Sequence, residues 1–390
     1  MFSLFIENER VTKLLNCNMN RPIYFWGIVS IMAVLSCLSC SNKDDENAIE
    51  ITPKKLDETI ENLFVSHKVI PLETNDNSLI SEISDIKEYN DTYFILDKGK
   101  NQILLFDKDG HYLSKIYHQG RGHGEYVAIT SYDISNDLVY VLSRGDSKIN
   151  IYSFSGEFTN DIKLDNYYQE LAVMDDYILL FSNYSNNSMT NYVKIDYKGK
   201  VIESWDPFKV NASYCVGENF LYKSGKTVLY CKPYDYNIYE YDGRNVVNIG
   251  HYAFKDQVRY SKNKKNNMEV ISNLTKNTEY VKYFSSVSRI GNYNVILYPR
   301  FVDEYGICTF IFVHNVLDNK CYNYCFSIQG FQSTPFIGRG MKLCNNSIIG
   351  TMPAFIIHDI AERESINDSI LLNLSDKDNP VLIRHELCLE

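Results

Sequence analysis

The densest group of residues with chemical potential in this chain is the heptapeptide GRGHGEY, residues 120–126. Its three alternating glycines allow backbone conformations that are closed to other residues, so the segment could fold around a ligand. A dinucleotide-binding loop needs GxGxxG between a strand and a helix, whereas this motif stands between two strand-like runs. Two interpretations follow. In the first, the motif is a corner between structural units, tied by charge-assisted hydrogen bonds from Arg121 and Glu125. In the second, it is a binding site at a rim, formed by Arg121, His123, Glu125 and Tyr126.

The remaining local motifs do not predict catalysis. His118, His123 and Glu125 superficially resemble a metal set, but no third histidine is near and their spacing fits no helix or strand face. Adjacent carboxylates such as Asp175 and Asp176 would point to opposite faces of a strand, which makes them poor acid–base pairs. The chain has no GxSxG or HExxH motif, and its cysteines form no CxxC pair beyond residue 40. Any site must therefore be assembled from distant segments.

A repeat indicates how distant segments would be brought together. Four times, two apolar runs flank a turn centred on glycine, and these glycines lie 46, 43 and 44 residues apart: Gly110, Gly156, Gly199 and Gly243. A hairpin that recurs with a period near 45 is typical of the four-stranded blades of a β-propeller. The sequence therefore predicts an all-β fold.

A second repeat predicts the number of blades. A polar turn followed by a dense apolar run occurs six times, at 89–97, 135–143, 174–182, 224–232, 291–299 and 344–352. We therefore expect a six-bladed propeller, with Asn319 in place of glycine in the outer hairpin of the fifth blade. The last blade is one strand short, and the run 63–73 is left over at the start. We expect this N-terminal strand to complete the last blade and close the ring, because closure leaves no long exposed edge. Short helices are expected within 261–277 and over 366–374.

A closed ring would place the starts of the six innermost strands around a central tunnel. Carboxylates in such a ring suit calcium, which prefers oxygen ligands. The candidate metal ligands near these positions are Glu82, Asp133, Glu170 and Glu218. Blades five and six offer Ser286 and Arg339 instead, which weakens the prediction, so no cofactor is expected unless it is calcium.

The N-terminal region is interpreted as a targeting segment rather than as part of the folded domain. Residues 23–38 are almost wholly apolar but short for a membrane-spanning helix, as in a signal peptide. Met19 is a natural start, so residues 1–18 are interpreted as an over-long start of the gene. The following CLSCSNKDDEN resembles the lipobox of bacterial lipoproteins. Cys40 is the favoured lipidation site because an acidic export-type stretch follows it. Cys37, which has the usual branched residue at the third place before it, is the alternative. An uncleaved anchor helix is a third interpretation.

Charge and polarity divide the rest of the chain. The net charge of −10 argues against a nucleic-acid partner, which would require clustered Lys and Arg. Residues 1–40 are interpreted as signal peptide and lipobox, residues 41–62 as a polar tether, and residues 63–390 as the propeller.

With these segments in view, the chain resembles the six-bladed β-propeller lipoproteins of Gram-negative bacteria, which are distant relatives of NHL-repeat propellers. The resemblance is carried by PLETNDNSLISEIS (71–84), by the run 93–116, by GRGHGEY and by DNPVLIRHEL (378–387). His123 stands where the family usually has proline. The resemblance implies an outer-membrane lipoprotein, periplasmic or surface-exposed, that is anchored through its lipidated cysteine.

The expected function is that of a lipid-anchored propeller of the cell envelope. It would act as a non-enzymatic binding or scaffold protein for a glycan, peptide or protein partner. The alternative is a propeller hydrolase or lyase that works at the central tunnel with calcium.

Overall fold

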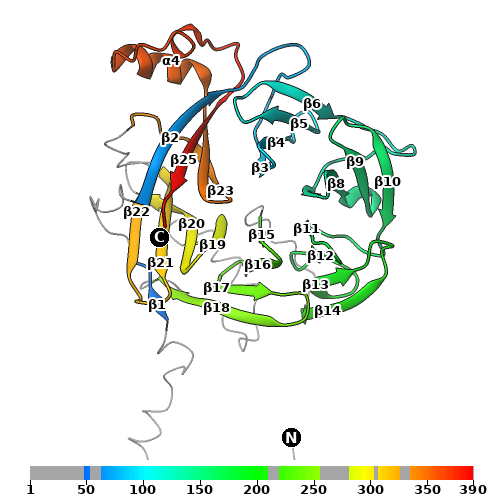
Figure 1. The fold of residues 1–390 in the computed structure, drawn as a ribbon. Helices are drawn as coiled ribbons and strands as arrows, with labels where there is room; N and C mark the ends of the chain where they lie inside the picture. Colours follow the sequence, from blue (N-terminus) through cyan, green and yellow to red (C-terminus); the bar gives the residue numbers. More distant parts are fainter. Residues whose placement is uncertain are drawn as a thin grey trace, which may run out of the picture. The chain divides into compact units, whose positions relative to one another are not determined.

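The fold consists of six antiparallel sheets arranged as blades around a common axis (Figure 1). The computed structural model describes residues 48–52, 63–209, 219–254, 281–302, 306–325 and 334–389. The blades lie in the unit that spans Ile49–Glu390. The predicted all-β, six-bladed propeller is confirmed.

In blades one to five, four consecutive strands pair from the axis outward, whereas the outermost strand of blade six comes from the N-terminal part of the chain. Blades one and two are formed by β3 (Asp85–Tyr89), β4 (Thr92–Asp97), β5 (Gln102–Asp107) and β6 (Tyr112–Ile116), and by β7 (Ser131–Ser135), β8 (Leu138–Ser143), β9 (Lys148–Ser153) and β10 (Phe158–Lys163). Blades three and four are formed by β11 (Glu170–Val173), β12 (Ile178–Phe181), β13 (Thr190–Ile195) and β14 (Val201–Pro207), and by β15 (Leu221–Ser224), β16 (Thr227–Lys232), β17 (Asp235–Tyr241) and β18 (Val246–Ala253). Blades five and six are formed by β19 (Ser286–Ile290), β20 (Tyr293–Val302), β21 (Gly306–Asn315) and β22 (Cys321–Cys325), and by β23 (Arg339–Cys344), β24 (Ser347–Met352), β25 (Val381–Leu387) and β2 (Phe64–Pro71).

The ring closes as the sequence predicts, because the N-terminal strand β2 pairs with the C-terminal strand β25. The pairing is antiparallel and runs from Phe64 opposite Leu387 to Pro71 opposite Val381. In Figure 1 these two strands, blue and red, lie side by side although they come from opposite ends of the sequence. The joint between the last and first blades therefore depends on contacts between the two ends of the propeller.

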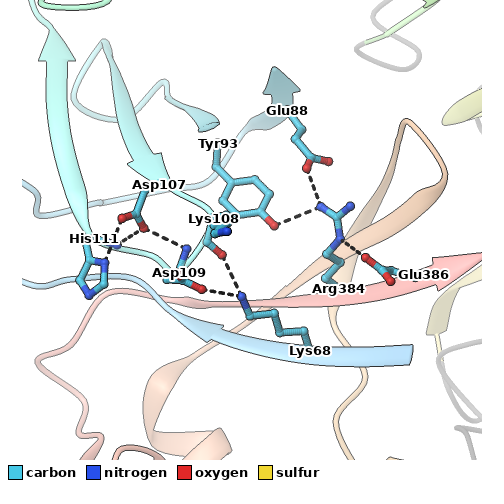
Figure 2. Close-up of polar contacts among 9 residues, drawn as sticks. All are labelled: Lys68, Glu88, Tyr93, Asp107, Lys108, Asp109, His111, Arg384 and Glu386. Carbon is cyan, nitrogen blue, oxygen red and sulfur yellow. Dashed lines mark hydrogen bonds and ion pairs between the residues drawn. The ribbon is translucent and has the colours of Figure 1, made fainter. Parts of the chain in front are cut away.

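An ion-pair network reinforces this joint (Figure 2). Arg384 on β25 reaches Glu88 on β3 at 2.7 Å and the hydroxyl of Tyr93 on β4 at 3.2 Å. On the outside of the ring, the Lys68 ammonium on β2 lies 2.7 Å from the carboxylate of Asp109 in the outer turn of blade one. Both contacts join blade six to blade one.

The turns of the blades explain the two sequence repeats. In the inner hairpins, Asn90, Asp91, Asn136 and Asp137 all have positive φ, as a tight two-residue turn requires. In the outer hairpins, the four repeat glycines have φ between +83° and +91°. Asn319, predicted to replace glycine in blade five, has φ of +57°.

The outer-turn glycine is also needed because the turn touches the preceding blade. A Cβ added at Gly156 would lie 2.5 Å from the carbonyl oxygen of Lys115, at the end of the outer strand of blade one. Gly199 stands in the same relation to Lys163 of blade two, also at 2.5 Å. The period near 45 thus records one contact that is repeated from blade to blade.

We expect Gly156→Ala to lower the free energy of unfolding by about 1 to 2 kcal/mol, because alanine is strained at positive φ and collides with Lys115. Gly291→Ala is the matched control, since Gly291 also has positive φ but has nothing within 4 Å of its Cβ position. Urea unfolding of both variants separates strain from collision. Equal losses in the two variants would contradict a role for contact between blades.

The helical predictions need correction. The α-helix near the C-terminus is α4 (Ala354–Arg363), whereas the expected helix over 366–374 contains only the 3₁₀ turn η3 (Leu371–Asn373). Helix α4 begins after Pro353 and buries Ile357 and Ile360 on one face. The helix expected within 261–277 lies outside the described residues.

Part of the segment expected to be a tether packs on the propeller. Strand β1 (Ile49–Glu50) pairs in parallel with β18, and Ile51 is buried at 1% exposure. The amide of Asn323 in blade five donates a hydrogen bond to the carbonyl of Thr52 at 3.0 Å. The packed chain therefore begins before residue 63.

Candidate functional site

The main concave site is an axial cavity of about 420 Å³ at the meeting point of the six inner strands. Strands β3, β7, β11, β15, β19 and β23 all contribute lining residues. Figure 1 shows β3, β11, β15, β19 and β23 near the centre of the ring. The cavity wall is rich in charged side chains: Asp85, Lys87, Glu88, Asp133, Glu170, Lys223, Arg289 and Lys342. The site is thus made by the whole ring and not by one motif.

Several polar side chains in the wall link one blade to the next. Asp133 of blade two accepts a hydrogen bond from the main-chain N–H of Val173 in blade three at 2.7 Å. Ser286 of blade five accepts one from Leu343 N–H in blade six at 2.9 Å. These contacts use the side chains to satisfy strand N–H groups that face the axis.

Glu170 makes the most buried of these links. Its two carboxylate oxygens accept hydrogen bonds from the N–H groups of Phe220 and Leu221, at 2.6 and 3.2 Å, and thereby tie blade three to blade four. Burial raises the pKa of Glu170 to about 8, and the hydrogen bonds from the main chain oppose this only in part. The residue is 2% exposed and lies in the wall rather than in the open space.

Three lysines approach the axis and bind the remaining carboxylates. Lys87 and Lys223 both bind Asp133, with N–O distances of 3.2 and 3.5 Å. Lys342 lies 3.6 Å from Asp85. The amide of Asn219, at the start of blade four, also donates to Asp85 of blade one at 2.9 Å, so this contact spans the cavity.

The lysines face the open space and the aspartates lie behind them. The side chains of Lys87, Lys223 and Lys342 are 26%, 31% and 17% exposed, whereas those of Asp133 and Asp85 are 5% and 10% exposed. A molecule that enters the cavity therefore meets ammonium groups before it meets carboxylates.

The central ion pair stays charged at neutral pH. Burial alone would raise the pKa of Asp133, but Lys87 and Lys223 outweigh it and hold that pKa below its usual range. Burial alone would lower the pKa of Lys87, but Asp133 and the neighbouring acidic groups outweigh it and raise that pKa.

Three of the four predicted metal ligands are among the described residues, and these three do not meet in one place. Asp133 and Glu170 lie in the cavity wall, where their oxygens bind lysines and main-chain N–H groups. Glu82 is exposed and does not line the cavity, because β3 begins at Asp85, three residues later. Glu218 lies outside the described residues. Within the described ranges, no group of three His, Cys, Asp or Glu side chains could hold a metal ion.

The GRGHGEY segment forms a corner between blades one and two. Tyr126 is fully buried, and its hydroxyl lies 3.1 Å from the carbonyl oxygen of Asn101. Glu125 accepts a hydrogen bond from Gly122 N–H at 2.6 Å and so closes its own loop, rather than joining Arg121 in a tie between blades.

The other two residues of the expected binding set are His123 and Arg121. His123 packs edge-on against Phe158 with ring centroids 4.8 Å apart. Arg121 is exposed and takes part in none of the ion pairs found among the described residues. The corner interpretation therefore accounts for this motif, although its bonding differs from the prediction.

The three cavity lysines were missed in the sequence. Each stands in an inner strand next to apolar residues, as in DIKEY, LYKS and RGMKLC. A lysine inside a short strand that precedes a tight turn was the available signal, but it could not show that the three would share one cavity.

The anchor predictions concern residues outside this description. The apolar run 23–38, Cys37 and Cys40 all lie outside the described residues. In the part of the chain that the structure describes, no helix has the length and apolarity needed to cross a bilayer.

Comparisons with known proteins support the fold. A family model described as "Domain of unknown function (DUF4934)" matches residues 47–386. The crystal structure of a "Putative exported protein" from Bacteroides fragilis is similar with a TM-score of 0.73 at 18% sequence identity, and the match covers 88% of this chain and 99% of that chain. A DUF4221 family member from Bacteroides vulgatus is similar with a TM-score of 0.53 at 12% identity, and the match covers 84% of this chain and 97% of that chain. No curated protein matches the sequence significantly.

Proposed function

The chain belongs to the DUF4934 family, a domain of unknown function, and from this premise we propose that it is a non-enzymatic binding protein of the cell envelope that holds its ligand in the axial cavity. The ligand would be a glycan, a peptide or a segment of a partner protein. The observation that carries the proposal is the open, polar cavity to which all six blades contribute.

The volume and lining of the cavity support binding. At about 420 Å³ it falls within the range of small-molecule sites, and it has room for a sugar unit or a short peptide segment. Amide and hydroxyl groups stand among its charges, including those of Asn219, Ser288 and Asn346. Such groups orient a polar ligand without forming covalent bonds to it.

The state of the carboxylates supports binding rather than catalysis. General acid–base work needs a carboxyl group within reach of the substrate. The cavity carboxylates of Asp85, Glu88, Asp133 and Glu170 are instead engaged by lysine, arginine, asparagine or main-chain N–H groups. Each of these carboxylates joins two blades.

Export and anchoring complete the proposal. The lipobox-like cysteines come just before residue 47, where the family match begins, and a structurally similar protein is described as exported. We expect cells to incorporate labelled palmitate into this protein, and to lose that label in the Cys40→Ala variant. Retention of label in Cys40→Ala and its loss in Cys37→Ala would move the anchor to the alternative site, and retention in both variants would contradict the anchor.

The binding proposal can be tested with a plug in the cavity. The purified full-length protein is screened by NMR against neutral, acidic and basic saccharides and short peptides. Ser288→Trp fills the cavity, and Ser204→Trp places the same side chain on the exposed outer strand β14. Binding should be lost only in Ser288→Trp. Binding that survives the plug, or conversion of a bound compound to product, would overturn the proposal, the latter in favour of the hydrolase or lyase alternative.

A further inference from the structure

We propose, building on the proposed function, that the ligand presents an anionic oxygen group to Lys87, Lys223 and Lys342, as a carboxylated or sulfated sugar would.

The open space is bordered by more lysine side chains than aspartate side chains. Three lysine ammonium groups share two aspartates, since Lys87 and Lys223 both bind Asp133 while Lys342 lies near Asp85. The other cations that border the cavity have acidic partners of their own. Arg289 lies 3.6 Å from Glu240, and Arg384, which lies behind the wall, binds Glu88 at 2.7 Å. One ammonium charge in the cavity is therefore not matched by an aspartate.

Glu170 does not supply the missing negative charge to the open space. It is 2% exposed, and both its oxygens accept hydrogen bonds from main-chain N–H groups. Burial raises its pKa to about 8, and the nearby charge of Lys87 opposes this rise only in part. The cationic side chains are therefore more exposed to the open space than the carboxylates, although the whole chain carries −10.

The cavity lysines retain hydrogen-bond donors that a ligand could use. The ion-pair contacts of Lys342 with Asp85 and of Lys223 with Asp133 measure 3.6 and 3.5 Å, at or beyond the limit of a hydrogen bond. Each ammonium group has three N–H donors and no acceptor. Lys223 donates one hydrogen bond to the Ile134 carbonyl at 2.6 Å, and Lys87 donates one to Asp133 at 3.2 Å, so each group keeps further donors for an entering oxyanion. Partial burial strengthens such contacts relative to those on an open surface.

The amide and hydroxyl side chains of the cavity suit a ligand that also carries hydroxyl groups. The same cavity is lined by amide and hydroxyl side chains that both donate and accept hydrogen bonds, namely Asn219, Ser224, Ser288, Asn345 and Asn346. Groups of this kind pair well with sugar hydroxyls. A free inorganic ion would leave most of them without a ligand contact.

The test separates the charge of the ligand from its hydroxyl groups. Glucuronate and glucose 6-sulfate are titrated by calorimetry beside the methyl ester of glucuronate, which is uncharged and one methyl group larger, and beside acetate, which has the charge but no hydroxyls. We expect at least one acidic sugar to bind about tenfold or more tightly than the ester, because a hydrogen bond to a charged group is strong. Binding should weaken at high salt, since ions screen the attraction.

Variants assign the effect to the lysines. Lys342→Gln should weaken binding of the acidic sugar about tenfold, whereas Lys342→Arg, which keeps the charge, should retain most of it. Lys198→Gln, in the exposed outer turn of blade three, is the matched control and should have no effect. Thermal unfolding of each variant verifies that it is folded.

The outcomes separate this inference from the binding proposal. If the ester binds as well as the acid, and Ser288→Trp abolishes both, the cavity is a binding site but the anionic inference is wrong. If Lys342→Gln behaves like Lys198→Gln, the inference is likewise wrong. If acetate binds as tightly as the acidic sugar, the hydroxylated part of the ligand class is wrong. If no sugar or peptide of any charge binds, both proposals fail.

Discussion

Arg384→Met should lower the free energy of unfolding by about 3 kcal/mol, the largest loss that we expect from a single substitution. Arg384 lies at the closure of the ring, where it binds Glu88 at 2.7 Å, the Tyr93 hydroxyl at 3.2 Å and Glu386 at 3.3 Å (Figure 2). The side chains of Arg384 and Glu88 are 17% and 10% exposed. Removal of the arginine leaves a nearly buried carboxylate without its cation, and breaking such a pair costs about 3 to 5 kcal/mol.

Urea unfolding of three variants tests the assignment. Arg363→Met is the control, because Arg363 is exposed at the end of α4 and its ion pair with Glu364 is exposed as well, so a loss of less than about 0.5 kcal/mol is expected. Glu88→Gln combined with Arg384→Met should recover part of the loss, since it removes the stranded charge. A loss for Arg384→Met as small as that for Arg363→Met would show that the joint does not depend on this network.

Acid should weaken the same joint through a pair of histidines. His67 on β2 and His385 on β25 are opposite each other in the closing sheet, with their Nδ1 atoms 2.7 Å apart. Burial, and next the proximity of His67, lower the pKa of His385 to about 3. In the unfolded chain this histidine takes up a proton near pH 6.5, so between pH 6.5 and 3 the unfolded state binds more protons than the folded state.

The direction of the pH effect follows from this difference. The contribution of His385 to stability is fully present above about pH 6.5 and declines as the pH falls, by about 1.4 kcal/mol per unit. At pH 5 the loss relative to pH 8 should be about 2 kcal/mol. His385→Gln should unfold with a flatter dependence on pH over this interval, as followed by urea titration.

A surface histidine provides the control. His111 lies in the exposed outer turn of blade one, and its hydrogen bond to Asp107 raises its pKa. Stability linked to that group is present at low pH and is lost as the pH rises, which is the opposite sign. His111→Gln should therefore not flatten the decline towards pH 5. An unchanged slope in His385→Gln would contradict the role assigned to the buried pair.

The fold was predictable because the chain repeats local rules. Glycine at positive φ in each outer turn and Asn-Asp pairs in the inner turns are visible in the sequence, and they mark the blades directly. The closing strand follows from a count of strands, because the last blade is one strand short and the run 63–73 belongs to no other blade. The turn signals are local in the sequence, whereas the pairing of β2 with β25 joins opposite ends of the propeller.

The candidate site was only partly predictable because it depends on spatial register. Asp133 and Glu170, two of the predicted metal ligands, lie in the cavity wall, whereas Glu82 does not line the cavity and the lining residue at the start of β3 is Asp85. An error of three residues in the start of a strand moves a side chain out of the cavity. The ammonium groups of Lys87, Lys223 and Lys342 come from three different blades, and nothing in their local sequence shows that they converge.

The short strand β1 would have a mechanical consequence if the chain is anchored through its N-terminal end, as we propose. Tension applied through the leading segment reaches Ile49–Thr52 before it reaches β2, because those residues come first along the chain. There the load meets the parallel pairing with β18, the bond from Ile51 N–H to the Ala253 carbonyl at 2.7 Å, and the insertion of the Ile51 side chain into the core. In a chain anchored in this way, blade four would thus bear tension before the pairing of β2 with β25 does.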